Sequence, residues 1–193
     1  MYKRQGIATI NELATPIDVP IRFKITASTV MNSFYIPALA GQIYAMPGME
    51  TQLNAVINKP GTFDGFSANF SGPGFSHMRF KYHGMDVADF DQWVKNAKKN
   101  GQTLDRAVYT ELEQPSEREP VRHFGKVAPD LYHAVLNRCV AEGTVCMNKI
   151  MHEDMTRMKV QAAAKNFLRD DKTALAEIDA AVCTPSTNLL KSN

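Results

Sequence analysis

Residues 60–78 read PGTFDGFSANFSGPGFSHM and lead directly into the alternating segment MRFKY at 78–82. In that segment apolar and polar side chains alternate, which is typical of a strand with one buried face. The same alternation occurs at 21–26 and 49–58. Proline and glycine separate these segments, as they do in turns between short strands. The first half of the chain therefore predicts a mainly β fold, an antiparallel sandwich or barrel.

The hydrophobic pattern changes after Gly84, where helical spacing replaces strand spacing. One helical face gathers Val87, Phe90, Trp93, Val94 and Ala97. Further helices are expected at 104–112, from Pro129 to about Gly143, and through most of 144–181, whereas 116–127 is polar and irregular. We therefore expect four parts, namely an N-terminal remnant at 1–5, a β-domain at 6–84, a helical extension at 85–143 and a helical, methionine-containing tail at 144–193.

Composition limits the classes of function. The 193 residues suffice for one domain with an appendage, and the formal net charge is only +2, which does not favour nucleic-acid binding. No segment approaches the roughly 20 apolar residues that span a bilayer, and the first residues do not form a signal peptide. On these grounds alone the chain is predicted to be water-soluble.

The three cysteines, Cys139, Cys146 and Cys183, match no zinc or redox motif in their spacing. They are interpreted either as packing residues or as one disulfide with one cysteine left over. A metal site is a further alternative. The spacing does not choose between these interpretations.

Two loops carry the strongest functional signal, VMNSFYIP at 30–37 and the stretch at 60–78, with QIYAMPGM at 42–49 between them. This order resembles subunit II of the haem–copper respiratory oxidases. In the cytochrome c oxidase branch the first loop carries a histidine, and the second carries Cys-x-Glu-x-Cys-x3-His-x2-Met. Together they hold a binuclear copper centre. The aligned positions here are Asn32, Ser67, Asn69, Ser71, Phe75 and Met78.

The chemistry of these replacements decides how the loops are interpreted. Copper of this kind needs thiolate and imidazole donors, whereas a serine hydroxyl does not ionise near neutral pH and Phe75 has no donor at all. Met78 is expected to fill a gap in the core and not to ligate a metal. Ser67 and Ser71 lack a Gly-x-Ser-x-Gly turn and a base, so no catalytic residue is assigned. We expect all six positions to serve packing and turns, without a metal.

The copper-free pattern resembles the cytochrome bo-type ubiquinol oxidases over about residues 5–140. The resemblance implies a cupredoxin-like Greek-key sandwich followed by the family's helical arm. It also implies a subunit of a proton-pumping ubiquinol:oxygen oxidoreductase of aerobic respiration. This chain is then expected to be non-catalytic and architectural, and to bind no cofactor. Haem and copper would belong to the large subunit.

The resemblance also implies partners and a location. The partners are oxidase subunit I and the other subunits of the complex, at the periplasmic face of the bacterial inner membrane. Members of the family are attached by two N-terminal membrane helices. Because this chain begins without them, we expect a truncated chain or fragment.

Histidine and methionine residues leave alternatives open. His77, His83, His123 and His133 are not expected to bind metal. In the tail, Met147, Met151, Met155 and Met158 form one helical stripe beside His152. The stripe is interpreted as an apolar face that packs or binds a partner, or as a set of soft donors for Cu(I). The second interpretation supports an alternative function, a free-standing periplasmic cupredoxin-like protein that handles copper.

Overall fold

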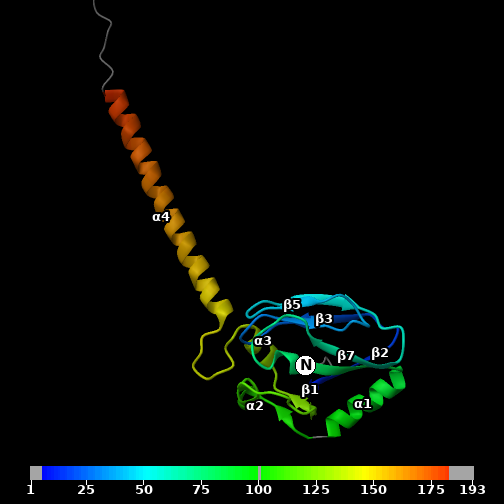
Figure 1. Ribbon diagram of the computed structural model, residues 1–193. Coiled ribbons are helices and arrows are strands. Elements are labelled where there is room, and N and C mark those ends of the chain that lie inside the picture. The colour runs from blue at the N-terminus through cyan, green and yellow to red at the C-terminus, as the bar shows by residue number, and fades with distance from the viewer. Residues whose placement is uncertain (1–5, 100, 183–193) are drawn as a thin grey trace, which may run out of the picture. The chain divides into compact units, whose positions relative to one another are not determined.

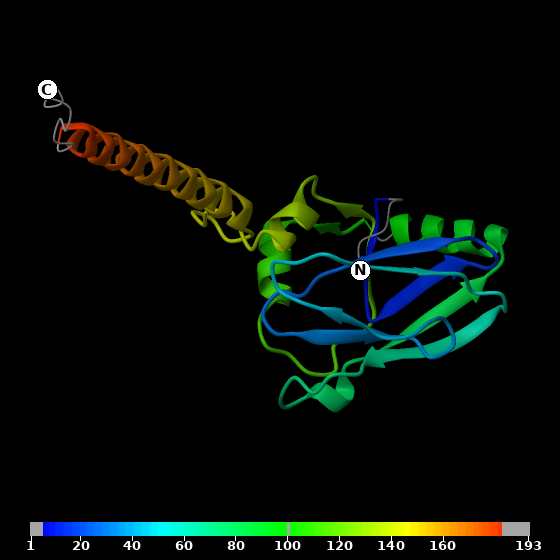
Figure 2. The same cartoon turned by 90° about the horizontal axis from the view of Figure 1, so that it is seen from above.

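The computed structural model describes residues 6–99 and 101–182 (Figures 1 and 2). It divides into two compact units, which meet between Met147 and Asn148. The expected N-terminal remnant and Cys183 lie outside the described residues. The first unit contains the strands and three α-helices, and the second consists of one long helix.

The β-domain is a cupredoxin-like sandwich built from a five-stranded sheet and a two-stranded sheet. The larger sheet has the order β2-β8-β7-β4-β5, and β3 pairs with β6 in the smaller one. Neighbours in this order that are not consecutive in the sequence are joined by crossover connections. The strands are β2 (Glu12–Pro16), β3 (Ile21–Ile25), β4 (Asn32–Tyr35), β5 (Ile43–Ala45), β6 (Thr51–Ala55), β7 (Gly61–Ser67) and β8 (Arg79–Met85).

One strand pair differs from the antiparallel arrangement that the sequence predicts. Strand β2 runs parallel to β8, with Leu13 opposite Tyr82. Parallel neighbours need a long crossover, and here the chain passes through all the intervening strands before it returns to β2. The first strand of the sheet therefore lies next to its last.

The core of the sandwich lies between the two sheets. It is formed by Leu13, Ile36, Ile57 and Tyr82, which are at most 6% exposed, with several phenylalanines packed around them. The alternation in β8 is confirmed, since Phe80 and Tyr82 turn inward while Arg79 and Lys81 are exposed. A Cβ atom at Gly65 would lie 2.2 Å from the Phe80 ring, so glycine at this position leaves room for that ring.

Helix α1 (Val87–Lys99) covers one edge of the β-domain (Figure 1). Its buried residues Phe90, Val94 and Ala97 pack with Ile7 and Ala14, as the helical face predicts. The helical spacing predicts Val87 on the same face, but Val87 is 57% exposed. It is the first residue of the helix and precedes the turns that meet the core.

Helix α2 (Arg106–Leu112) begins later than the sequence predicts. The Asp105 carboxylate caps it by accepting a hydrogen bond of 2.9 Å from the Val108 N–H. Leu104 instead belongs to the short strand β9 (Thr103–Leu104), which pairs in parallel with β11 (Lys126–Val127).

The expectation of irregular chain at 116–127 is wrong at its C-terminal end. Strand β10 (Arg122–Phe124) pairs antiparallel with β1 (Ala8–Ile10) and buries Phe124. Its three residues are too few to show a recognisable alternation. Its partner strand lies over 100 residues earlier in the chain, so no local pattern indicates the pairing. The extension at 85–143, which we call the arm, is therefore joined to the start of the β-domain by backbone hydrogen bonds.

A second core forms where the arm folds back on itself. Helix α3 (Leu131–Leu136) contributes Leu131 and Ala134, which cluster with Leu104, Phe124, Cys139 and Val140. Helix α3 ends well before Gly143, where the predicted helix stops. Cys139 and Cys146 form a disulfide, which settles the interpretation that the sequence left open. Such bonds persist in oxidising compartments such as the periplasm.

The second unit is the continuation of helix α4 (Met147–Val182). All its described side chains, from Asn148 to Val160 and at several positions beyond, are exposed. Within residues 6–99 and 101–182, no helix is both long enough and apolar enough to cross a bilayer.

Candidate functional site

The two loops identified from the sequence meet at one end of the sandwich. Strands β4 and β7 are antiparallel neighbours, with Phe34 opposite Ser67. The beginning of β4 therefore lies beside the end of β7, where the second loop starts. This register brings Asn32, Ser67 and Asn69 together although they are up to 37 residues apart in the sequence.

Hydrogen bonds connect the first three positions directly. The Ser67 hydroxyl lies 3.3 Å from Oδ1 of Asn32 and 3.5 Å from the carbonyl oxygen of Asn69, both of which can accept its proton. The backbone N–H of Ser33 donates to the Ser67 oxygen over 3.5 Å. The Asn69 amide donates to the carbonyl oxygen of Met31 at 3.4 Å. These groups satisfy one another and fasten the two loops together.

The remaining three positions lie on the second half of the loop. The Ser71 hydroxyl donates to the Met78 sulfur over 3.5 Å. Phe75 begins the short 3-10 helix η1 (Phe75–His77), and its ring packs edge-on against Phe70 at 5.7 Å. Met78 is 41% exposed, so the expectation that it fills the core is wrong. Met78 lies just before the first residue of β8, outside the strand whose alternate side chains face the core.

The donor set does not fit the binuclear copper centre of the cytochrome c oxidase branch. Two bridging thiolates and two imidazoles are replaced by hydroxyls, a neutral amide and a hydrocarbon ring. The thioether of Met78 is the one soft donor retained among the six positions. The hydroxyl and amide groups also hydrogen-bond to each other and to backbone. These hydrogen bonds hold the two loops in place, and we assign the six side chains no other chemical role.

The arm contacts the same loop from outside. Arg118 lies 3.2 Å from Nε2 of the exposed His77. Glu117 lies against Gly74, where an added Cβ atom would approach its carboxylate to 3.0 Å. Gly74 also has a φ of +81°. Both the nearby carboxylate and this backbone conformation therefore favour glycine at position 74. The segment before β10 thus covers part of the second loop.

A second polar cluster joins β2, β8 and β10, and sequence reasoning missed it. One carboxylate oxygen of Glu12 lies 3.0 Å from Nε2 of His83, and the other pairs with Nε2 of His123. The Thr62 hydroxyl lies 3.0 Å from Nδ1 of His83. No group of three or more His, Cys, Asp or Glu in the described chain is arranged to hold a metal ion. We interpret the cluster as a set of polar contacts that attach the arm to the five-stranded sheet.

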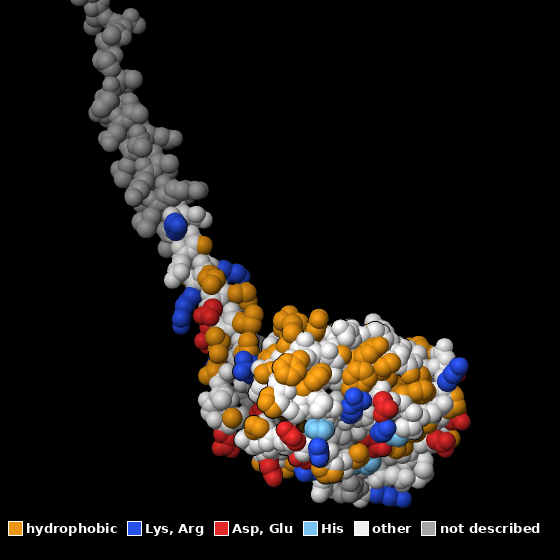
Figure 3. All heavy atoms as spheres, viewed as in Figure 1, with side chains coloured by type: hydrophobic (Ala, Val, Ile, Leu, Met, Phe, Trp, Pro, Cys, Tyr) orange, Lys and Arg blue, Asp and Glu red, His pale blue; other side chains and the backbone are white. Residues whose placement is uncertain are grey.

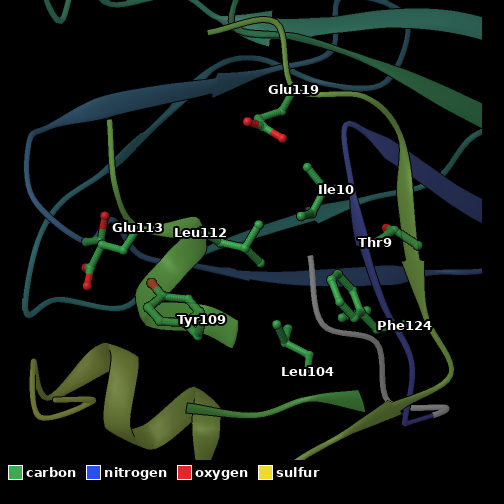
Figure 4. Close-up of a pocket in the computed structure, with 10 residues that line it drawn as sticks. Thr9, Ile10, Leu104, Tyr109, Leu112, Glu113, Glu119 and Phe124 are labelled. Atoms are coloured by element: carbon green, nitrogen blue, oxygen red, sulfur yellow. The ribbon is translucent and has the colours of Figure 1, made fainter. Parts of the chain in front are cut away.

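A small pocket of about 250 Å³ lies between β1, β10 and α2 (Figure 4). Ile10, Leu112 and Phe124 make its lining mainly apolar. Burial, assisted by the charge of Glu113, raises the pKa of Tyr109 to about 12. Its phenol therefore stays protonated at neutral pH and does not act as a base. The volume is below that of ordinary small-molecule sites. We therefore do not assign the pocket as the functional site of the chain.

Comparison with known families defines the class of the protein. Residues 3–84 match the family described as cytochrome c oxidase subunit II, periplasmic domain. Residues 98–143 match the COX aromatic rich motif. The two matches correspond to the sandwich and to the arm that folds against it. The matched part of the chain therefore belongs to the subunit II family of the haem–copper oxidases.

The individual relatives belong to the quinol oxidase branch. The chain is 45% identical over 138 residues to cytochrome bo(3) ubiquinol oxidase subunit 2 of Pseudomonas putida, covering 72% of this chain and 44% of the relative. The corresponding subunit of Pseudomonas aeruginosa is 47% identical over 138 residues, covering 72% and 42%. Quinol oxidase subunit 2 of Bacillus cereus is 41% identical over 114 residues, covering 59% and 39%.

The comparison with solved structures finds the periplasmic domain of subunit II of cytochrome oxidase (CoxB) of Bradyrhizobium japonicum. It is 28% identical, covers 47% of this chain and 66% of that chain, and has a TM-score of 0.45. The chain spans less than half the length of the curated relatives described above.

Proposed function

We propose that this chain is the copper-free periplasmic part of subunit II in a proton-pumping ubiquinol:oxygen oxidoreductase. It supports the complex structurally and carries no redox step of its own. The observation that supports this most directly is the loop site. The fold keeps the two loops together, yet hydroxyls and amides that bond to one another stand where an electron-entry centre needs thiolates and imidazoles.

The use of a quinol as electron donor would make a copper centre in the two loops unnecessary. A lipid-soluble quinol delivers electrons inside the membrane, so no copper relay is needed at the water-exposed surface. Haem and copper then belong to the large subunit, and this chain holds neither in its loops. The formal net charge of +2 agrees, because a soluble, charged electron donor does not have to be steered to this domain.

The proposed partners are oxidase subunit I and the other subunits of a complex in the bacterial inner membrane. The sandwich lies on the periplasmic face, where the Cys139–Cys146 disulfide is stable. Attachment to the membrane is through N-terminal helices of the kind found in the family. One face of the first unit shows apolar side chains among scattered charges of both signs (Figure 3).

A second candidate function is a free-standing periplasmic copper-handling protein. One observation favours it, the exposure of three methionines on α4. The match of both the sandwich and the arm to subunit II opposes it, because a free-standing protein has no need of the arm.

The proposal is tested by affinity purification of the tagged natural gene product from detergent-solubilised membranes. We expect it to co-purify with haem-containing subunit I and with ubiquinol oxidase activity. Recovery of the protein alone from the periplasmic fraction, without haem, would contradict the proposal and favour the second candidate. Ser67→Ala serves as a matched variant, since loss of one loop hydroxyl is expected to leave the activity of the complex unchanged.

A further inference from the structure

Helix α4 carries an exposed stripe of methionines that the proposed function does not use. Met151, Met155 and Met158 are 58%, 53% and 67% exposed. Their separations of four and three residues place them on one face of the helix. Figure 3 shows hydrophobic side chains along the described part of α4, beside charged ones. Met147, the first of the four that the sequence grouped together, is half-buried and lies against Gly48 instead.

The stripe does not have the pattern of a helix-pairing seam. Such a seam needs apolar residues that recur over at least three heptads. Along this face Asp154, Gln161 and Lys165 interrupt the recurrence. Beyond Met158 the described side chains on this face are small or polar. A short patch of three thioethers is therefore poorly suited to a partner helix.

The same three side chains suit a soft metal ion. Neighbouring positions on the stripe have Cβ atoms about 5–6 Å apart, and unbranched methionine side chains can bring their sulfurs together across that gap. Soft thioether donors select Cu(I) over the harder divalent ions.

The compartment strengthens this argument. The Cys139–Cys146 disulfide lies shortly before α4 in the sequence and indicates an oxidising environment. There, thiols are consumed by disulfide formation, whereas thioethers remain available as soft ligands.

We propose that Met151, Met155 and Met158 form a surface site for Cu(I). This differs from the expectation, made from the sequence for the whole chain, that it binds no metal and no cofactor. The inference rests on the exposure and spacing of the α4 methionines and does not depend on the proposed function. Binding here involves no electron transfer, since the ion enters and leaves as Cu(I).

The test is an anaerobic titration of the whole chain with the Cu(I)–bicinchoninate complex, followed by its loss of colour. Every sample carries Cys183→Ser, since a thiolate would compete with thioethers and Cys183 lies outside the described residues. The stripe variant combines Met151→Leu, Met155→Leu and Met158→Leu, which preserve helix propensity. We expect the parent to withdraw one Cu(I) from the chelator and the stripe variant to bind it at least about tenfold more weakly.

The control variant changes three exposed methionines of the β-domain, Met31, Met49 and Met78, to leucine. These are 43%, 54% and 41% exposed, so the control removes the same number of accessible thioethers. It should bind Cu(I) as the parent does. The proposal is overturned if the parent withdraws no Cu(I), if the stripe variant binds as tightly as the parent, or if the control loses binding. Circular dichroism confirms that each variant is folded.

Discussion

At the scale of single residues, the polar groups of the loop site form hydrogen bonds with one another and with the backbone. Ser67 occupies a position expected for a bridging thiolate, and its hydroxyl finds partners in Asn32 and the Ser33 backbone. Its neighbour Ser33 behaves differently. The Ser33 hydroxyl is buried and makes no hydrogen bond with any described residue. Two serines in adjacent strands therefore have opposite energetic roles.

This contrast predicts opposite effects for two alanine variants. Ser33→Ala removes a buried hydroxyl that has lost its water without gaining a partner, so the free energy of unfolding should rise by about 1 kcal/mol. Ser67→Ala removes a hydroxyl that holds two loops together, so the same quantity should fall by about 1 kcal/mol. Urea denaturation of the two variants measures both. A loss of stability in Ser33→Ala would show that its hydroxyl has a partner after all.

At the scale of elements, the arm is fastened to the sandwich at several separate places. Strand β10 pairs with β1, and His123 reaches Glu12. On helix α3, Tyr132 donates a hydrogen bond of 2.8 Å to the Glu50 carboxylate, which also forms an ion pair with Lys24 at 3.0 Å. These contacts lower the pKa of Glu50 below its ordinary value of 4.5, with the Tyr132 bond as the largest cause.

The Glu50 contact predicts a pH-dependent contribution to stability. A carboxyl group whose pKa is lowered by folding stabilises the native state above its unfolded pKa, and this contribution is lost as the pH falls through the folded pKa. Tyr132→Phe should therefore lower the free energy of unfolding by about 1–2 kcal/mol at pH 7. The difference from the parent should shrink below pH 4.5.

Thermal denaturation at several pH values measures this difference. Tyr44→Phe is the matched control, because the Tyr44 side chain is 47% exposed and lies in the edge strand β5. It should change stability little at any pH. A Tyr132→Phe effect that is equal at pH 7 and at pH 3 would mean that the bond to the Glu50 carboxylate contributes nothing.

At the scale of the whole molecule, the fold brings the two loops together at one end of the sandwich. The antiparallel register of β4 and β7 holds the two loops at the same end of the sandwich. Turn glycines at 72 and 74, with φ values of +116° and +81°, shape the second loop between Ser71 and Phe75. The side chains at the six loop positions, and not any feature of the backbone, are the reason why we expect no binuclear copper centre here.

Introducing the donors of the cytochrome c oxidase branch should then create a copper site. We expect a variant with Asn32→His, Ser67→Cys, Asn69→Glu, Ser71→Cys and Phe75→His, in which Met78 is retained, to form a coloured binuclear copper site. Visible absorption and metal analysis of the folded variant measure it. A control that keeps Ser71 lacks one bridging thiolate; its single thiolate, two imidazoles and thioether are the ligand set of a mononuclear blue-copper site, so it should bind at most one copper ion and lack the absorption of a binuclear centre. A folded five-substitution variant that binds no copper would show that the loop alignment is wrong.

The sequence by itself determined the β-domain, the α1 face and the two loops, because alternation, helical spacing and turn residues are local signals. It also determined the chemistry of the loops, since a missing thiolate is visible without any coordinates. Only the tertiary structure decided which cysteines pair, that β2 and β8 run parallel, and that β10 exists at all. It alone brought Glu12, His83 and His123 together and placed Met78 at the surface. These features depend on contacts between residues far apart in the chain, and their formation is fixed by the packing of the whole fold.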